Sequence, residues 1–261
     1  MPFTLAHPAA VLPLRHLRWL RTAPLVIGAL VPDAIYYFPE VLKEHVRRLD
    51  THSLTGSYSF DLPLGVALLV CTVLLREPLT VLLPARARWL CLKALEPFRQ
   101  RHSAVQWLLA PPAIYIGICT HLLWDSFTHG DGWAVQHIGV LSDSVTIGAY
   151  TSAVCRILQY LSSVIGLALV ALWYLKLPTP ATVHAGQAAR RAHAGPGLLL
   201  VMGASLLIGG VEAQRYYAHS QGSLYRTLDE LLTRSLAWFV LLDLCAGTIV
   251  TLEQRAARHP P

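Results

Sequence analysis

Three polar side chains recur at helical spacing in one apolar stretch, namely His121, Asp125 and His129. At about 100° per residue, an α-helix places all three on one face. Imidazole and carboxylate groups one helical turn apart can bind one divalent ion, so this stretch predicts a metal site. The alternative is that the three are interfacial polar residues that hydrogen-bond to neighbouring helices, since polar groups in an apolar helix must find partners.

Three more polar residues adjoin apolar stretches and are candidates for the same site. His52 lies in Thr51-His52-Ser53, where it is either a ligand or a solvated loop histidine. Asp33 follows Pro32 within an apolar stretch, and a carboxylate there is costly unless it is paired. Asp61 opens an apolar run and is either a helix cap or a member of the site.

The elements that carry these residues are predicted to be membrane helices. Of the 261 residues, 54% are hydrophobic and 14% are charged, whereas a soluble domain carries about 25% charged residues. The surplus apolar surface must face lipid. Six apolar stretches can be drawn, at residues 24–38, 62–75, 107–124, 157–175, 198–211 and 236–252.

We therefore predict an all-α polytopic membrane helical bundle with about five to six transmembrane or re-entrant helices. The first, second and fifth stretches are short for a full crossing, so they can tilt, thin the bilayer locally or re-enter. The chain is expected to form one membrane domain over residues 1–261, with a motif-bearing part at 1–175 and two further helices at 196–252.

Loop charges predict the orientation of these helices. Residues 85–106 carry five basic side chains and one acidic side chain, and should be cytoplasmic. Residues 126–153 carry two acidic side chains and no Lys or Arg, and should lie outside. Alternation from these two loops places residues 39–61 outside and the C-terminus in the cytoplasm. The candidate residues Asp33, His52, Asp61, His121, Asp125 and His129 then converge on the outer face, whereas His7 falls on the cytoplasmic side.

The remaining charges indicate no nucleic-acid partner. The net charge of +6 comes from basic residues between apolar runs, where orientation and contact with anionic lipid explain them. Glu212 and Asp243 lie within or beside the last two apolar stretches, with Arg215 and Arg234 as available partners. They form either a buried ion pair between helices or part of a proton or ion path.

Several motifs together resemble one bacterial membrane-protein family of unknown function. The opening Pro2-Phe-Thr-Leu-Ala-His7-Pro-Ala-Ala-Val-Leu-Pro-Leu14 is the first of them. The others are Gly28–Asp33, Thr51–Leu54 with Phe60–Pro63, Thr120–His129 and Leu158–Ser163. The resemblance covers residues 1–175. That family is similar in turn to bacterial inner-membrane metal-dependent hydrolases, and more distantly to zinc-dependent phospholipase C and its nuclease relatives.

The resemblance implies a set of site residues that is larger than the spacing alone supports. Its metal ligands would be His7, Asp33, His52, His121, Asp125 and His129, with zinc as the expected ion. Ser53, Trp124, Thr128 and Gln159 would surround the ligands or contact the substrate. The resemblance also implies a location in the bacterial cytoplasmic membrane.

These observations lead to one main hypothesis, a membrane-embedded metal-dependent hydrolase that acts on a lipid phosphoester or a similar amphipathic substrate at the outer face. A bound divalent ion would activate water, with Asp61 as the expected catalytic base and Asp33 or Asp125 as alternatives. One alternative is a non-enzymatic membrane protein with a structural or metal-binding polar cluster. Another is a transporter that uses Glu212 and Asp243.

Overall fold

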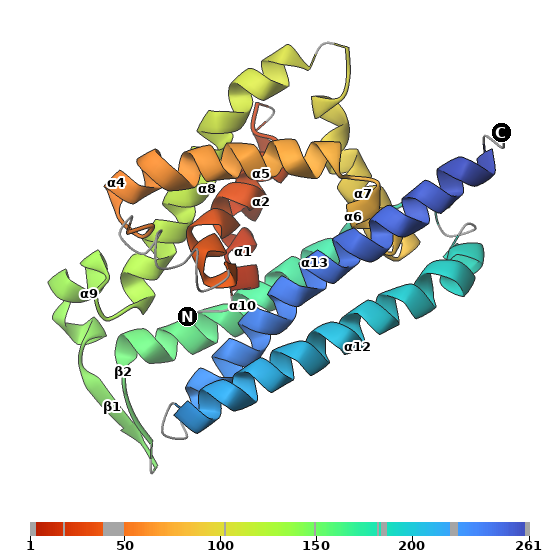
Figure 1. Cartoon of the computed structure of the whole chain (residues 1–261). Coiled ribbons are helices and arrows are strands. Elements are labelled where there is room, and N and C mark those ends of the chain that lie inside the picture. The colour runs from red at the N-terminus through yellow and green to blue at the C-terminus, as the bar shows by residue number, and fades with distance from the viewer. Residues whose placement is uncertain are drawn as a thin grey trace. The chain divides into compact units, whose positions relative to one another are not determined.

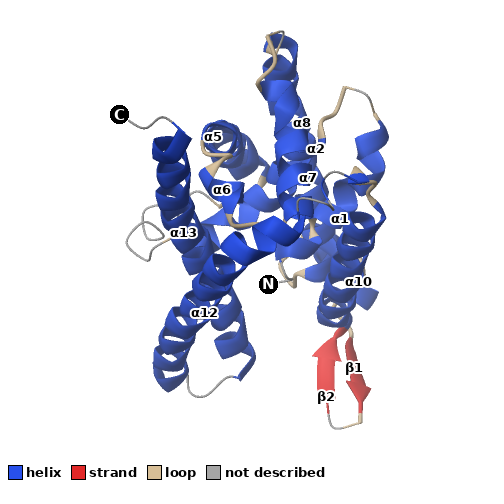
Figure 2. Cartoon of the chain, turned by 90° about the vertical axis from the view of Figure 1, so that its right-hand side faces the viewer, coloured by secondary structure: helices blue, strands red, loops and turns tan. Residues whose placement is uncertain are grey.

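Helices account for most of the chain in the computed structural model (Figure 2). The structure describes residues 4–17, 19–38, 50–101, 103–148, 150–181, 183, 187–219 and 224–258. Within them, five helices are long and apolar enough to cross a membrane: Leu54–Leu74, Ala104–Thr128, Val154–Lys176, Gly195–Tyr217 and Thr227–Ala257. A shorter apolar helix covers Thr22–Tyr37. The predicted all-α polytopic bundle is confirmed.

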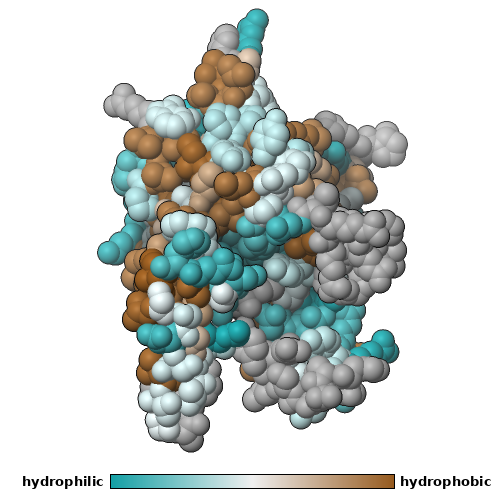
Figure 3. All heavy atoms as spheres, turned by 90° about the vertical axis from the view of Figure 1, so that its left-hand side faces the viewer, coloured by the Kyte–Doolittle hydropathy of each residue, from teal (hydrophilic) through white to brown (hydrophobic). Residues whose placement is uncertain are grey.

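The surfaces of these helices are apolar, as the bilayer requires. Leu108 on one candidate span is 76% exposed and Leu207 on another is 70% exposed. Apolar side chains reach the surface on the face that Figure 3 displays. A water-soluble bundle would bury such leucines, so their exposure agrees with contact to lipid.

Residue contacts divide the chain into two units. Unit 1 comprises Met1–Ile35, Val41–Leu69 and His102–Leu177, and unit 2 comprises Tyr36–Glu40, Val70–Arg101 and Pro178–Pro261. Every candidate metal ligand falls in unit 1. The single membrane domain expected over residues 1–261 stays a prediction.

Unit 1 is built from short N-terminal turns and three candidate spans. Its elements are η1 (Thr4–Ala6), α1 (Pro8–Val11), η2 (Leu12–His16), α2 (Thr22–Leu30), the first part of η3 (Val31–Tyr37), α4 (Leu54–Gly56), η5 (Ser57–Asp61), the first part of α5 (Leu62–Leu74), α8 (Ala104–Thr128), α9 (Trp133–His137), η7 (Gly139–Leu141), β1 (Ser144–Ile147), β2 (Tyr150–Ala153) and α10 (Val154–Lys176). The N-terminal turns pack in a buried cluster with α2 and α8, through Val11, Leu25 and Ala113.

Two glycines let α2 and α8 cross at backbone contact (Figure 1). A Cβ on Gly28 would clash with the carbonyl oxygen of Ile114, and a Cβ on Gly117 would clash with that of Leu25. Small residues at such crossings let membrane helices approach closely. Because Gly117 precedes His121 by one helical turn, this crossing also brings α8's polar face against the end of α2.

The loop between α8 and α10 forms a β-hairpin that the sequence analysis did not predict. Strands β1 and β2 pair antiparallel, with Ser144 opposite Ala153 and Ile147 opposite Tyr150. Gly148 has a φ of 63° in the turn, a conformation that glycine adopts freely. The β-branched residues of both strands suit this pairing.

Unit 2 contains two long helices that lie side by side, α12 (Gln187–His219) and α13 (Leu224–Arg258) (Figure 1). The shorter elements are α6 (Pro78–Val81), α7 (Ala85–Leu95) and η6 (Glu96–Phe98). A Cβ on Gly209 of α12 would clash with Ser235 of α13, so these helices also pack through a glycine.

Candidate metal centre

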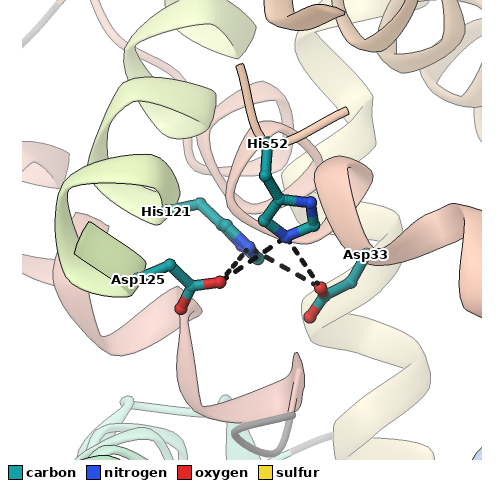
Figure 4. Close-up of side chains that lie close together, drawn as sticks. All are labelled: Asp33, His52, His121 and Asp125. Carbon is teal, nitrogen blue, oxygen red and sulfur yellow. Dashed lines mark ion pairs between the residues drawn. The ribbon is translucent and has the colours of Figure 1, made fainter. Parts of the chain in front are cut away.

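Four side chains of unit 1 point toward a common centre: Asp33, His52, His121 and Asp125 (Figure 4). Each offers one ligand atom, and these atoms all lie within 4.8 Å of one another. The Nε2 atom of His121 lies 3.3 Å from Oδ2 of Asp125 and 3.7 Å from Oδ1 of Asp33. The Nε2 atom of His52 lies 3.5 Å from each of these two oxygens. Two imidazoles therefore lie between two carboxylates.

Three elements supply these side chains. His121 and Asp125 lie on successive turns of α8, and Asp33 lies on η3, directly after α2. His52 lies in a turn whose first residue, Asp50, has a φ of 36°, a left-handed conformation that aspartate tolerates. Ser53 closes this turn, because its hydroxyl donates to the Asp50 carbonyl oxygen over 2.8 Å and accepts from the backbone N–H of Gly56.

The hydrogen bonds of His121 leave its inner nitrogen available to an ion. Its Nδ1–H donates to the backbone carbonyl of Ala29 over 2.8 Å, so in the neutral ring Nε2 carries the lone pair. Neither this Nε2 nor Oδ2 of Asp125 has a hydrogen-bond partner among the described residues, and both are buried. Metal-binding histidines commonly donate their other N–H to a carbonyl in this way. The residues therefore fit a metal ion.

His52 carries a positive charge in the metal-free cluster. Burial alone lowers its pKa, but the carboxylates of Asp125 and Asp33 outweigh burial and raise the pKa to about 10. Its Nδ1 lies 3.1 Å from the hydroxyl oxygen of the buried Thr51. At neutral pH, the protonated His52 ring therefore balances the charge of the two carboxylates, as a bound cation would do.

His7 lies beside this cluster, contrary to the orientation argument that placed it on the cytoplasmic side. Its Nε2 lies 3.0 Å from Oδ1 of Asp125, and its ring stacks on His121 with centroids 3.8 Å apart. His7 lies here because η1, α1 and η2 are short turns that fold back onto α2 and α8. Figure 4 draws the four-residue group, of which His7 is not a member.

His129 flanks Asp125 on the other side. Its Nδ1 lies 3.5 Å from Oδ2 of Asp125, and its Nε2 lies 3.1 Å from the amide nitrogen of the buried Gln159. Burial lowers the pKa of His129, which favours the neutral ring, in which Nε2 can accept from Gln159. The hydroxyl of Thr128 lies 3.5 Å from Nδ1 of His129.

Trp124 links the cluster to α10. Its Nε1–H donates to the hydroxyl of Ser162 over 3.1 Å, and its ring lies against His7 with centroids 5.6 Å apart. Ser53, as the cap of α4, holds the turn that carries His52. Four of the eleven predicted site residues thus form the group, and Ser53 directly follows one of them, His52, in the chain. Five more lie in contact with the group or with one another, namely His7, Trp124, Thr128, His129 and Gln159.

Asp61 is completely buried, and neither of its carboxylate oxygens has a hydrogen-bond partner among the described residues. It lies on η5, which packs against α8, the helix that carries His121 and Asp125. The helix begins at Leu54, so the prediction that Asp61 could cap it is wrong. Asp61 instead ends a π-helical turn, a distortion that is frequent at functional sites.

Glu212 and Asp243, both in unit 2, differ in their surroundings. Glu212 lies 3.8 Å from Nε of Arg234 and accepts from the indole N–H of Trp238 over 3.2 Å. The interpretation as an ion pair between helices therefore fits Glu212. Asp243 is buried, and its Oδ1 has no partner in the part of the chain that the structure describes.

Three contributors to the site were missing from the sequence-based set. The Thr4 hydroxyl donates to Oδ2 of Asp33 over 2.7 Å, the Thr51 hydroxyl faces His52, and the Ala29 carbonyl orients His121. Thr4 and Thr51 lie inside the motifs that carried the resemblance, which was their only signal. A backbone carbonyl has no signal in the sequence.

Comparison with known proteins identifies a family without a known activity. The family model described as "Domain of unknown function (DUF4184)" matches residues 1–252, which include every candidate site residue. No curated protein and no solved structure matches the chain.

Proposed function

We propose that this chain, which belongs to the DUF4184 family, is a membrane-embedded metal-dependent hydrolase. The observation that carries the proposal is the group formed by Asp33, His52, His121 and Asp125, whose ligand atoms lie within 4.8 Å of one another. Nitrogen and oxygen donors without cysteine are typical of catalytic rather than structural zinc sites. Zinc is therefore the ion we propose.

The four ligands and their neighbours would divide the chemical work. A divalent ion bound by them supplies Lewis acidity, which activates water and polarises the bond to be cleaved. Asp61 is proposed as the general base, because a buried carboxylate without partners near the cluster can take up a proton. His129, held by Gln159, would keep Asp125 in place.

The surface beside the site favours an amphipathic substrate. The side chain of His52 is 29% exposed, so the cluster can be reached there. Leu54 and Tyr58, on the turns that follow His52, are 76% and 70% exposed. Leu123, on the turn of α8 that also carries His121, is 64% exposed. An apolar tail against these side chains would bring a phosphoester or similar polar group to His52, in agreement with a lipid substrate.

Metal content is the first test. Detergent-purified wild type should hold a stoichiometric divalent ion by elemental analysis, and His121→Ala and Asp125→Ala should lose it. The control is Leu123→Ala, which changes a neighbouring exposed side chain of α8. A wild type that holds no stoichiometric metal after purification without chelators would refute the proposal.

Turnover is the second test. Fluorescent lipid phosphoesters in mixed micelles should be hydrolysed by the wild type, and not after chelation or by Asp61→Asn. Full metal content without turnover of any phosphoester would favour the non-enzymatic metal-binding alternative instead.

The loop charges support a site on the outer face of a bacterial cytoplasmic membrane, with a cytoplasmic C-terminus. Gly130 offers a labelling position, since a Cβ there meets nothing within 4 Å. In a variant without the five native cysteines, Gly130→Cys should react with an impermeant thiol reagent in intact cells. Protection until the cells are broken would place the site on the inner face.

A further inference from the structure

Each carboxylate of the cluster has one oxygen toward the centre and one held from outside. In Asp33, Oδ1 faces the two central histidines, and Oδ2 accepts from the hydroxyl of Thr4 over 2.7 Å. In Asp125, Oδ2 faces the same histidines, and Oδ1 lies 3.0 Å from Nε2 of His7. Both outer contacts come from one N-terminal segment, although Asp33 and Asp125 lie far apart in the chain.

His7 and His121 resemble each other at one ring nitrogen, because Nδ1 of each faces a backbone carbonyl oxygen, that of Thr4 at 3.3 Å and that of Ala29 at 2.8 Å. They differ in the oxygen of Asp125 that Nε2 faces. His121 faces Oδ2, the oxygen toward the centre, whereas His7 faces Oδ1, the outer oxygen. The group whose ligand atoms all lie within 4.8 Å of one another contains His121 and not His7. This placement favours a contact to Asp125 over a ligand.

Packing holds the N-terminal segment in this position. Ala6 and His7 are each 1% exposed. A Cβ on Gly166 of α10 would lie 2.9 Å from the Cβ of Ala6, so the absence of a side chain at Gly166 makes room for the segment. The stack of His7 on His121 adds a second contact to the cluster.

We infer that Thr4 and His7 are positioning residues, which turn Asp33 and Asp125 so that each offers one oxygen to the metal, and that His7 itself is not a ligand. This inference rests on the proposed metal site. Groups that orient ligands in this way typically change metal affinity about 10- to 100-fold when they are lost. The segment Thr4–His7 is thus part of the metal centre without touching the ion.

The test uses Co²⁺ as the probe, with the full chain in detergent and competition with a chelator of known affinity. Thr4→Val should weaken Co²⁺ binding about 10- to 100-fold, and Thr4→Ser, which keeps the hydroxyl, should bind like the wild type. His7→Gln keeps a donor toward Asp125, and X-ray absorption should find the same number of imidazoles around Co²⁺ as in the wild type.

A second variant pair moves the segment without changing its side chains. Gly166→Ala should weaken Co²⁺ binding by displacing Ala6, whereas Gly203→Ala, a helical glycine with nothing within 4 Å, should not. Wild-type affinity in Thr4→Val, or one imidazole fewer around Co²⁺ in His7→Gln, overturns the inference while the proposed function stands. A wild type that binds no Co²⁺ overturns both.

Discussion

Asp125 is the residue around which the site is organised, because four imidazoles surround its carboxylate. Its Oδ1 faces His7, and its Oδ2 faces His52, His121 and His129 at 3.3 to 3.5 Å. A buried carboxylate is expensive unless such partners compensate for the loss of water. An aspartate in an apolar helix, such as Asp125, therefore indicates that partner side chains lie near it in the folded protein.

The raised pKa of His52 predicts how metal binding depends on pH. Its pKa of about 10 means that the metal-free protein holds a proton on His52 at neutral pH, which an ion must displace. Apparent Co²⁺ affinity should therefore rise about tenfold per pH unit between pH 6 and 8. Equilibrium titrations at several pH values measure this slope. In His52→Gln the slope should be smaller, and an equal slope would show that another group supplies the proton.

Replacing Asp61 should stabilise the protein while it removes the proposed activity. Because burying a carboxylate without partners costs more than burying a neutral amide of the same shape, Asp61→Asn should raise the melting temperature of the metal-free protein in detergent. Asp33→Asn is the matched control, and it should lower the melting temperature because Asp33 holds Thr4 and faces His52. An Asp61→Asn variant less stable than the wild type would contradict the absence of partners at Asp61.

At the scale of elements, the site depends on how closely α2 and α8 approach. Gly28 and Gly117 are in backbone contact, and at this crossing the Ala29 carbonyl oxygen lies 2.8 Å from Nδ1 of His121. The same crossing places Asp33, just beyond α2, opposite the polar face of α8. The packed pair of helices thus positions three of the four ligands, and the turn that precedes α4 supplies the fourth, His52.

Widening this crossing should remove the metal site before it unfolds the helices. Gly117→Val forces α8 away from Leu25 of α2, at a cost of about 1–3 kcal/mol, and should abolish stoichiometric metal binding. The control is Gly203→Val, since a Cβ at Gly203 of α12 meets nothing within 4 Å. Metal content by elemental analysis, with helicity by circular dichroism, distinguishes the outcomes. Normal metal content in Gly117→Val would show that the crossing can relax.

At the scale of the molecule, the candidate metal centre belongs to one unit. The ligands and the side chains that contact them all lie in unit 1, whereas Glu212 and Asp243 lie in unit 2. Glu212 is paired with Arg234, while Asp243 leaves one buried oxygen without a partner among the described residues. The metal site and the carboxylates of the transporter hypothesis can therefore be tested separately.

Changes to Asp243 should leave the metal centre intact. Asp243→Asn is expected to keep the wild-type metal content and lipid turnover, because no described residue of the metal centre lies in unit 2. Asp125→Asn, a matched change in a buried carboxylate, should lose both. Elemental analysis and the lipid assay measure the two effects. If Asp243→Asn kept its full metal content but lost lipid turnover, Asp243 would have a role in the reaction.

Periodicity and composition alone determined the membrane class, the approximate helices and the polar face of α8, because lipid exposure and helical spacing are properties of local sequence. The same patterns selected Asp33 and His52, since polar groups beside apolar runs need partners. Only the tertiary structure decided which atoms meet. The glycine crossing, the left-handed turn at Asp50 and the folded N-terminal segment bring residues together over long sequence separations, and such separations leave no periodic signal in the chain.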